Sequence, residues 1–189
     1  GSQFTCHHTE ASARKRFWLS AFGHIDAVVK AGRVWNDVPY PLLIIPNANL
    51  SYTLQKESFA LMNPMEFIAD NYVSWEAIYY MNGALFNRLP LIKRLGWREV
   101  IDFKGFYGSL RPGNMPDVTN SHNLFLFPTP TRQTVTERTM LTSTPYMELS
   151  FGIANIFKVL EVDYVRRLTY LNVPGISKHG VRIRVHVEF

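Results

Sequence analysis

The sequence is poor in cysteine and in long hydrophobic runs, and both absences narrow what the protein can be. Cys6 is the one cysteine among 189 residues, so the chain cannot form an internal disulfide. The best apolar run, Leu42–Ile45, is far shorter than the roughly 20 residues of a membrane-spanning helix. Disorder is also excluded, because 47% of the residues are apolar and 14% are aromatic. A folded chain with this much Tyr and Phe favours β-structure.

Motifs for catalysis, metal binding and nucleic-acid binding are missing as well. No Ser, His and Asp stand in a nucleophile context and there is no glycine-rich phosphate loop, so the sequence predicts a protein that is not an enzyme and needs no cofactor. His7 and His8 are adjacent in a predicted strand and point to opposite faces, which argues against a metal site with Cys6. The net charge of +5 is scattered rather than gathered into a helical stripe, so we expect no nucleic-acid partner.

The sequence does show alternation of apolar and polar residues, and the alternation is uninterrupted over Gly180–Phe189. One side of this segment is apolar and the other is charged: Val181, Ile183, Val185, Val187 and Phe189 against Arg182, Arg184, His186 and Glu188. Successive side chains of a β-strand point to opposite faces, so the pattern predicts a strand with two unlike faces. In a soluble protein the apolar face meets a core, whereas in an outer-membrane barrel it meets lipid and the charged face lines the lumen. The terminal aromatic residue favours the barrel.

Similar alternation predicts six further strands. They cover residues 4–20, 23–35, 73–85, 98–110, 146–154 and 159–171. The spacing is typical of antiparallel hairpins and no long segment has a helical period, so we expect about 8–10 strands in a single all-β domain over residues 1–189. Prolines and asparagines predict a break over 36–49, while residues 50–70 predict either a short helix or an inserted loop. The predicted fold class is an antiparallel transmembrane β-barrel.

Four stretches of this pattern resemble one family of large outer-membrane proteins. They are KRFWLSAFGHIDAVVKAGRVWNDVPYPLLIIPNANLSY, FALMNPMEFIADNYVSWEAIYYMNGALFNRLPLIK, YMELSFGIANIFKVLEVDYVRRLTYL and the ending GVRIRVHVEF. In that family, typical of Bacteroidota, a carboxypeptidase-regulatory-like β-sandwich precedes a C-terminal barrel of unassigned function. The resemblance implies that this chain is a fragment, the C-terminal part of such a barrel, in the outer membrane of a Gram-negative bacterium.

A second likeness is to the barrel superfamily of outer-membrane assembly factors and two-partner-secretion proteins. Leu85–Leu91 is similar to a strand ending of that superfamily, and Tyr146–Tyr170 with Gly180–Phe189 is similar to its closing strands. Under this likeness, Phe59–Tyr72 corresponds to the loop that folds back into the barrel. The Arg-Gly signature of the superfamily is absent from this stretch.

The barrel hypothesis assigns a set of charged residues to the lumen. These are Asp26, Lys30, Glu148, Asp163, Arg167, Arg182, Arg184, His186 and Glu188. Cross-strand ion pairing is the plain account of them, and a gating or conducting role would use the same residues. The expected function is structural, assembly-related or transport-related. The expected partners are outer-membrane lipid and lipopolysaccharide, the barrel assembly machinery through the strand ending at Phe189, and the missing N-terminal part of the protein.

Two alternatives are compatible with the same alternation. A soluble β-barrel or sandwich that binds an apolar ligand requires the apolar faces to converge on an interior. A barrel-borne hydrolase requires a polar cluster in a cleft, and the sequence offers no candidate triad. The last strand discriminates between lipid and core, because the membrane hypothesis requires Arg182 and Arg184 on the inside of a curved sheet and the alternate apolar residues outside.

Overall fold

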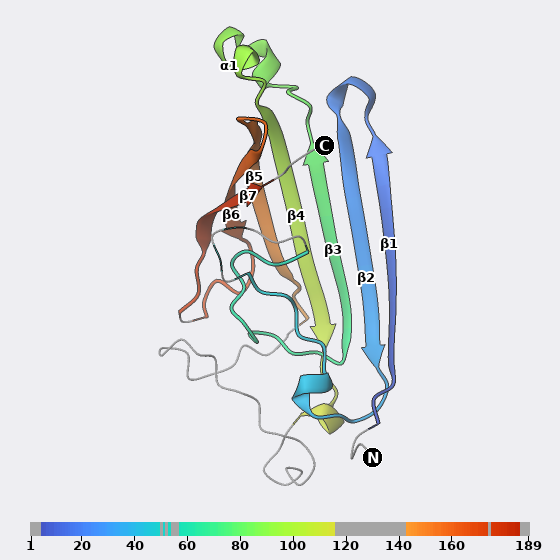
Figure 1. The fold of residues 1–189 in the computed structure, drawn as a ribbon. Helices are drawn as coiled ribbons and strands as arrows, with labels where there is room; N and C mark the ends of the chain where they lie inside the picture. Colours follow the sequence, from blue (N-terminus) through green and yellow to red (C-terminus); the bar gives the residue numbers. More distant parts are fainter. Residues whose placement is uncertain are drawn as a thin grey trace.

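The computed structural model describes residues 5–49, 51, 53, 57–115, 143–173 and 175–185. These residues form one antiparallel sheet of seven strands, and the spatial order of the strands follows the sequence (Figure 1). The strands are β1 (His8–Trp18), β2 (His24–Val34), β3 (Asn71–Tyr80), β4 (Arg98–Ser109), β5 (Tyr146–Ile156), β6 (Leu160–Arg167) and β7 (His179–Val185). One short helix, α1 (Pro90–Leu95), lies between β3 and β4.

The predicted all-β antiparallel architecture is confirmed, but the predicted strand number and closure are not. Each of the seven strands overlaps the segment that alternation predicted, but β3 ends at Tyr80 rather than at residue 85 and β6 ends at Arg167 rather than at residue 171. Residues 186–189 of the last predicted strand fall outside the described residues. The prediction of about 8–10 strands exceeds the seven of the described residues. The sheet is not closed into a barrel, because β1 and β7 are its two edges and do not pair with each other in the described ranges. Thr53 forms an isolated bridge with Ile183 on the edge of β7.

The six connections alternate between the two ends of the sheet. At one end residues 19–23, 81–97 and 157–159 join β1 to β2, β3 to β4 and β5 to β6. At the other end residues 35–70, 110–145 and 168–178 join β2 to β3, β4 to β5 and β6 to β7. Figure 1 shows α1 and the β1–β2 turn together at the upper end. Two of the three connections at the first end have five residues or fewer, and two of the three at the second end have more than thirty. We therefore call the two ends the short-connection end and the long-connection end, although residues 81–97 form a longer connection than residues 168–178.

Residues 35–70, here called the inserted segment, fold back over one face of the sheet (Figure 1). The described part of this segment contains no α-helix, so the inserted loop rather than the short helix is the correct alternative for residues 50–70. Its two arms are tied together where Ile44 and Ala69 exchange backbone hydrogen bonds of 2.8 and 3.0 Å. The main hydrophobic core lies between this segment and the sheet, where Phe59 and Phe67 pack on Tyr146.

No helix in the described part of the chain is long and apolar enough to cross a membrane.

Candidate functional site

The register of the strands gives the sheet two chemically different faces. Residues paired across neighbouring antiparallel strands lie on the same face, so the pairs can be followed from β1 to β7. We call the face that contacts the inserted segment the covered face, and the opposite one the bare face. The covered face carries the charged strand residues Glu10, Arg14, Arg16, Asp26, Lys30, Glu76, Arg98, Asp102, Lys104, Glu148, Glu161, Asp163, Arg167, Arg182 and Arg184.

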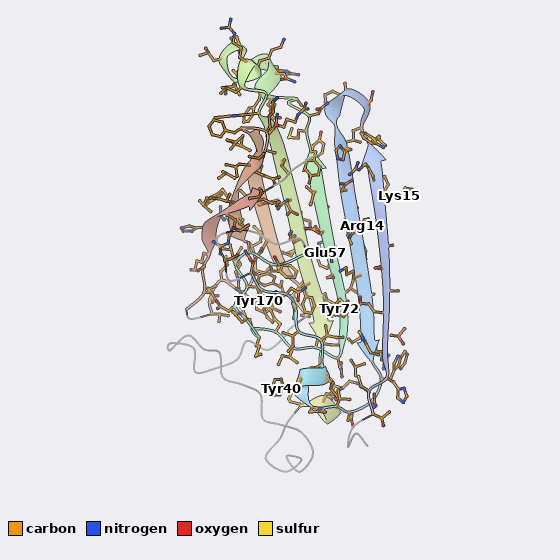
Figure 2. All side chains as sticks on the ribbon, viewed as in Figure 1. Arg14, Lys15, Tyr40, Glu57, Tyr72 and Tyr170 are labelled. Carbon is orange, nitrogen blue, oxygen red and sulfur yellow. The ribbon has the colours of Figure 1, made fainter. Side chains whose placement is uncertain are left out.

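The bare face is apolar along every strand. Its exposed large side chains are Phe17, Val29, Val73, Tyr107, Phe151, Tyr164, Val181, Ile183 and Val185. Charged residues occupy only four of its described strand positions: Lys15, Arg33, Glu99 and Arg166. Figure 2 shows Lys15 extending away from β1.

A buried ion pair binds the inserted segment to the covered face. Arg167 donates two hydrogen bonds to Glu66, from Nη2 to Oε1 at 2.6 Å and from Nη1 to Oε2 at 3.1 Å. Both side chains are almost fully buried, at 0% and 4% exposure. The guanidinium also lies 4.6 Å from the ring centre of Tyr146 and donates from Nε to the carbonyl of Thr169. A bidentate Arg–carboxylate pair fixes geometry in two directions, so it sets the position of the inserted segment on β6.

A second glutamate holds the inserted segment by its backbone. The carboxylate of Glu148 accepts hydrogen bonds from the amides of Ala60 at 2.8 Å and Leu61 at 2.7 Å. The hydroxyl of Tyr146 donates to the same carboxylate. From β7, the Nη2 of Arg182 donates to the carbonyl of Ala60 at 2.6 Å. Two strands separated by β6 therefore bind one turn of the segment, on both its donor and its acceptor side.

The middle of the covered face holds a network of four carboxylates and two cations. Nζ of Lys104 lies 2.6 Å from Glu76 and 3.4 Å from Asp102, and it also donates to the carbonyl of Ser58. The charged network continues at Arg184, whose nitrogens lie 3.4, 3.2 and 3.6 Å from its three acidic neighbours, Asp102, Glu161 and Asp163. The six side chains are 0–15% exposed on the covered face, and Lys104 links them to the inserted segment. They form one connected ionic layer that crosses from β3 to β7.

The contact of the inserted segment with β1 and β2, through Glu57, is more open to solvent. Glu57 accepts hydrogen bonds from Lys30 of β2 and from Arg14 of β1, the latter at 2.7 Å (Figure 2). The Lys30 ammonium holds the pKa of Glu57 below its usual range, against the opposing effect of partial burial. On the same strands Arg16 and Asp26 form a bidentate pair at 2.6 and 2.7 Å.

A cleft of about 360 Å³ lies between the inserted segment and β1–β4. Polar groups from both sides line it, among them Glu10, Lys30, Glu57 and Tyr72, together with the apolar Ile44. The described residues contain no group of three or more His, Cys, Asp or Glu that could hold a metal ion. The arrangement is therefore suited to holding the inserted segment on the sheet, with a small polar cleft beside it.

Seven of the nine charged residues predicted for the lumen are described, and all seven lie on the covered face: Asp26, Lys30, Glu148, Asp163, Arg167, Arg182 and Arg184. His186 and Glu188 lie outside the described residues. The structure joins Arg184 to Asp163, but it pairs Arg167 with Glu66 rather than with a strand residue. Asp26 and Lys30 belong to two separate ion pairs.

Sequence reasoning missed several members of the ionic layer. Glu76, Asp102 and Lys104 stand at polar positions of correctly predicted strands, so the same alternation that selected Asp163 also applies to them. Glu57 and Glu66 carry no such signal, because they lie in an irregular segment and meet their partners only through the tertiary fold.

Comparison with protein-family models, with curated proteins and with solved structures finds no match to this chain.

Proposed function

We propose that this chain forms part of the wall of an outer-membrane β-barrel, with a structural, assembly-related or transport-related role rather than a catalytic one. The observation that carries the proposal is the arrangement of the two faces. The apolar face is bare, and the charged face is covered by the inserted segment. A soluble β-protein has the opposite arrangement, with its apolar faces turned towards a core.

The composition of the bare face supports contact with lipid. A basic side chain on a lipid-facing strand costs about 2–4 kcal/mol at the bilayer midplane and about 0–1 kcal/mol near the interfaces. Arg33, Glu99 and Arg166 all lie within two residues of a strand end, where the cost is low. Lys15 lies further in, and its long side chain can extend towards the interface. Trp75 covers Gly105 on this face, since a Cβ at Gly105 would lie 2.1 Å from the indole.

The last strand argues against the soluble ligand-binding alternative. Val181, Ile183 and Val185 are 54%, 42% and 58% exposed, while the residues between them contact the inserted segment or the ionic layer. No described element covers the apolar side chains. The apolar side chains of the bare face thus do not converge on an interior in the described part of the chain, unlike Phe106 and Tyr146 of the covered face, which pack in the core under the inserted segment.

Four of the six connections fit the topology of such barrels, which have short turns on the periplasmic side and longer loops outside; residues 81–97 and 168–178 do not follow this rule. In this assignment the short-connection end faces the periplasm. Strands β1 and β7 both run from the long-connection end to the short-connection end. Closure of an all-antiparallel barrel therefore requires an odd number of further strands between them, since unpaired strand edges are not tolerated in lipid. The resemblance to the Bacteroidota outer-membrane family, with its longer barrel, supports the same proposal.

Within the barrel, the inserted segment acts as an internal plug. It is attached to the wall at β5, β6 and β7 through Glu148, Arg167 and Arg182. The ionic layer lies on the covered face, opposite the bare face, so its charges do not meet lipid in this arrangement.

The test uses the depth of single tryptophans in lipid vesicles. Trp75 lies on the bare face near the middle of β3, whereas Trp35 lies outside the strands at the long-connection end. Variants of the complete barrel protein that keep only one of these tryptophans are reconstituted into vesicles with bromine on the mid-acyl chain. We expect strong quenching of Trp75 and little quenching of Trp35. Quenching of Trp75 by aqueous acrylamide, with none by the brominated lipid, would overturn the proposal and favour the soluble alternative.

A further inference from the structure

The three connections at the short-connection end share one property that lipid-facing strands do not require. Residues 19–23, 81–97 and 157–159, here called the rim, expose large apolar side chains at one end of the sheet. The exposed ones are Leu19, Phe22, Leu85, Leu89, Leu91, Leu95, Phe157 and Val159. Leu91 is 80% exposed and Phe157 is 84% exposed. Clustered apolar exposure of this kind marks an interaction surface.

The charge of the rim has a single sign. Its three connections contain no Asp or Glu, and their four basic residues, Arg88, Lys93, Arg94 and Lys158, are all exposed. The nearest strand carboxylate on β4, Glu99, is already engaged, because it accepts hydrogen bonds from the amides of Leu85 and Phe86. The rim therefore presents leucine and phenylalanine side chains among uncompensated cations.

The exposed leucines are held in place rather than free to collapse on the sheet. Leu91 and Leu95 are four residues apart on α1 and so share one helix face. Helix α1 begins with Pro90 and ends at Leu95, and Gly96, which has a φ of 68°, caps its C-terminal end. From β5, Nδ2 of Asn155 donates to the carbonyl of Gly96 at 2.7 Å. Helix α1 is thus fixed at the short-connection end of the sheet.

The opposite end shows that such exposure is not a general property of the connections. There most of the large apolar residues described in the inserted segment, such as Leu43, Leu61 and Phe67, are buried or half-buried, and Trp35, Leu42 and Met65 are the exposed ones. The difference indicates that the rim is adapted to an apolar and anionic environment, whereas the long-connection end is adapted to its own core.

We propose that the rim binds the anionic headgroups of a phospholipid leaflet, with its leucines inserted at the boundary between headgroups and acyl chains. Apolar side chains interspersed with Lys and Arg are typical of segments that lie in this interface, and basic residues near an anionic surface are attracted to it. The rim is also continuous with the bare face, whose strands end at it. The inference rests on the proposed membrane insertion, and it adds the leaflet and the lipid chemistry.

The experiment keeps Trp97, at the base of α1, as the one tryptophan and reconstitutes the protein in mixed phosphatidylcholine and phosphatidylglycerol vesicles. In one sample only the phosphatidylcholine is brominated and in the other only the phosphatidylglycerol. We expect the anionic lipid to quench Trp97 at least about twofold more strongly. The double charge reversal Lys93→Glu/Arg94→Glu should remove this preference, while the matched reversal Lys178→Glu, at the long-connection end, should keep it. Salt of about 1 M, which shortens the Debye length to about 3 Å, should weaken it.

Trp75 separates failure of the inference from failure of the proposed function. Quenching of Trp75 together with equal quenching of Trp97 by both lipids would overturn the lipid selectivity. Quenching of Trp75 with no quenching of Trp97 by either lipid would show that the rim lies in water and would overturn the inference. Absence of quenching at both positions would overturn the membrane proposal itself.

Discussion

The two faces of the seven-stranded sheet differ in chemistry, one charged and one apolar, and the adjacent residues Arg166 and Arg167 show the contrast. Arg167 is 1% exposed and forms a bidentate pair with the inserted segment, whereas Arg166 lies on the bare face among apolar residues. A buried charge needs a partner and hydrogen bonds, while an apolar face needs only an apolar surrounding. The inserted segment supplies the partner of the buried charge, Glu66. Because the segment lies on the charged face, the apolar surrounding of the bare face must come from the environment of the sheet.

The comparison predicts that the largest single effect comes from the buried ion pair. Arg167→Met leaves the carboxylate of Glu66 buried without its cation, which should lower the free energy of unfolding by about 3–5 kcal/mol. The measurement is urea unfolding of the reconstituted protein. Arg166→Met is the matched control and should change stability by less than about 0.5 kcal/mol. Equal effects of the two substitutions would show that the two faces do not differ in burial.

The double variant Arg167→Met/Glu66→Met sharpens this prediction. Removal of both charges from a buried pair is often neutral, so the double variant should recover most of the stability that Arg167→Met loses. A loss equal to the sum of the two single losses would mean that the residues act independently.

The bare face should tolerate charge only at its margins. Phe151, in the middle of β5, is 57% exposed, and Phe151→Arg should cost about 2–4 kcal/mol in a lipid bilayer. Asn71→Arg, on the same face at the start of β3, should cost about 0–1 kcal/mol. Unfolding in vesicles measures both costs, and Phe151→Ala controls for the loss of the ring. If Phe151→Arg costs no more than Phe151→Ala, lipid does not contact this face.

Glu148 provides a smaller effect on the covered face, limited to one turn of the inserted segment. Glu148→Gln keeps the shape but replaces a charged acceptor of two backbone amides with one neutral oxygen, and each hydrogen bond to a charged group is worth about 1.5–3 kcal/mol. We expect faster hydrogen exchange at the amides of Ala60 and Leu61. Glu10→Gln, on the same face but exposed, is the control and should leave both rates unchanged. Unchanged rates in the Glu148 variant would contradict its anchoring role.

The strands were predictable from the sequence because their signal is local. Alternation along each strand fixes which side chains share a face, and the hairpin order then fixes the register; residues such as Asp163 and Arg184 follow from both. The covering of the charged face was not predictable. Glu66 and Arg167 are 101 residues apart, and no periodic pattern in the inserted segment marks Glu66 as a partner. Helix α1 was also missed, since six residues are too few to establish a helical period.

The smallest expected effect tests the open margin of the covered face, at Glu57. The Lys30 ammonium lowers the pKa of this carboxyl in the folded protein, so the folded state binds its proton less readily than the unfolded state does. The resulting stabilisation is complete above the usual glutamate pKa of about 4.3 and is lost as the pH falls through the lowered folded pKa. The Glu57 side chain is 35% exposed, so solvent screens its ion pairs and the effect is smaller than at Glu66.

Comparison of the free energy of unfolding of the wild type and Glu57→Gln at pH 7 and at pH 3 measures this contribution. The wild type should be the more stable protein at pH 7, and the difference should shrink at pH 3 and in high salt. A difference that is independent of pH would show that Glu57 acts through packing rather than charge. The inserted segment would then be held to β1 and β2 by its shape and to β5, β6 and β7 by its charges.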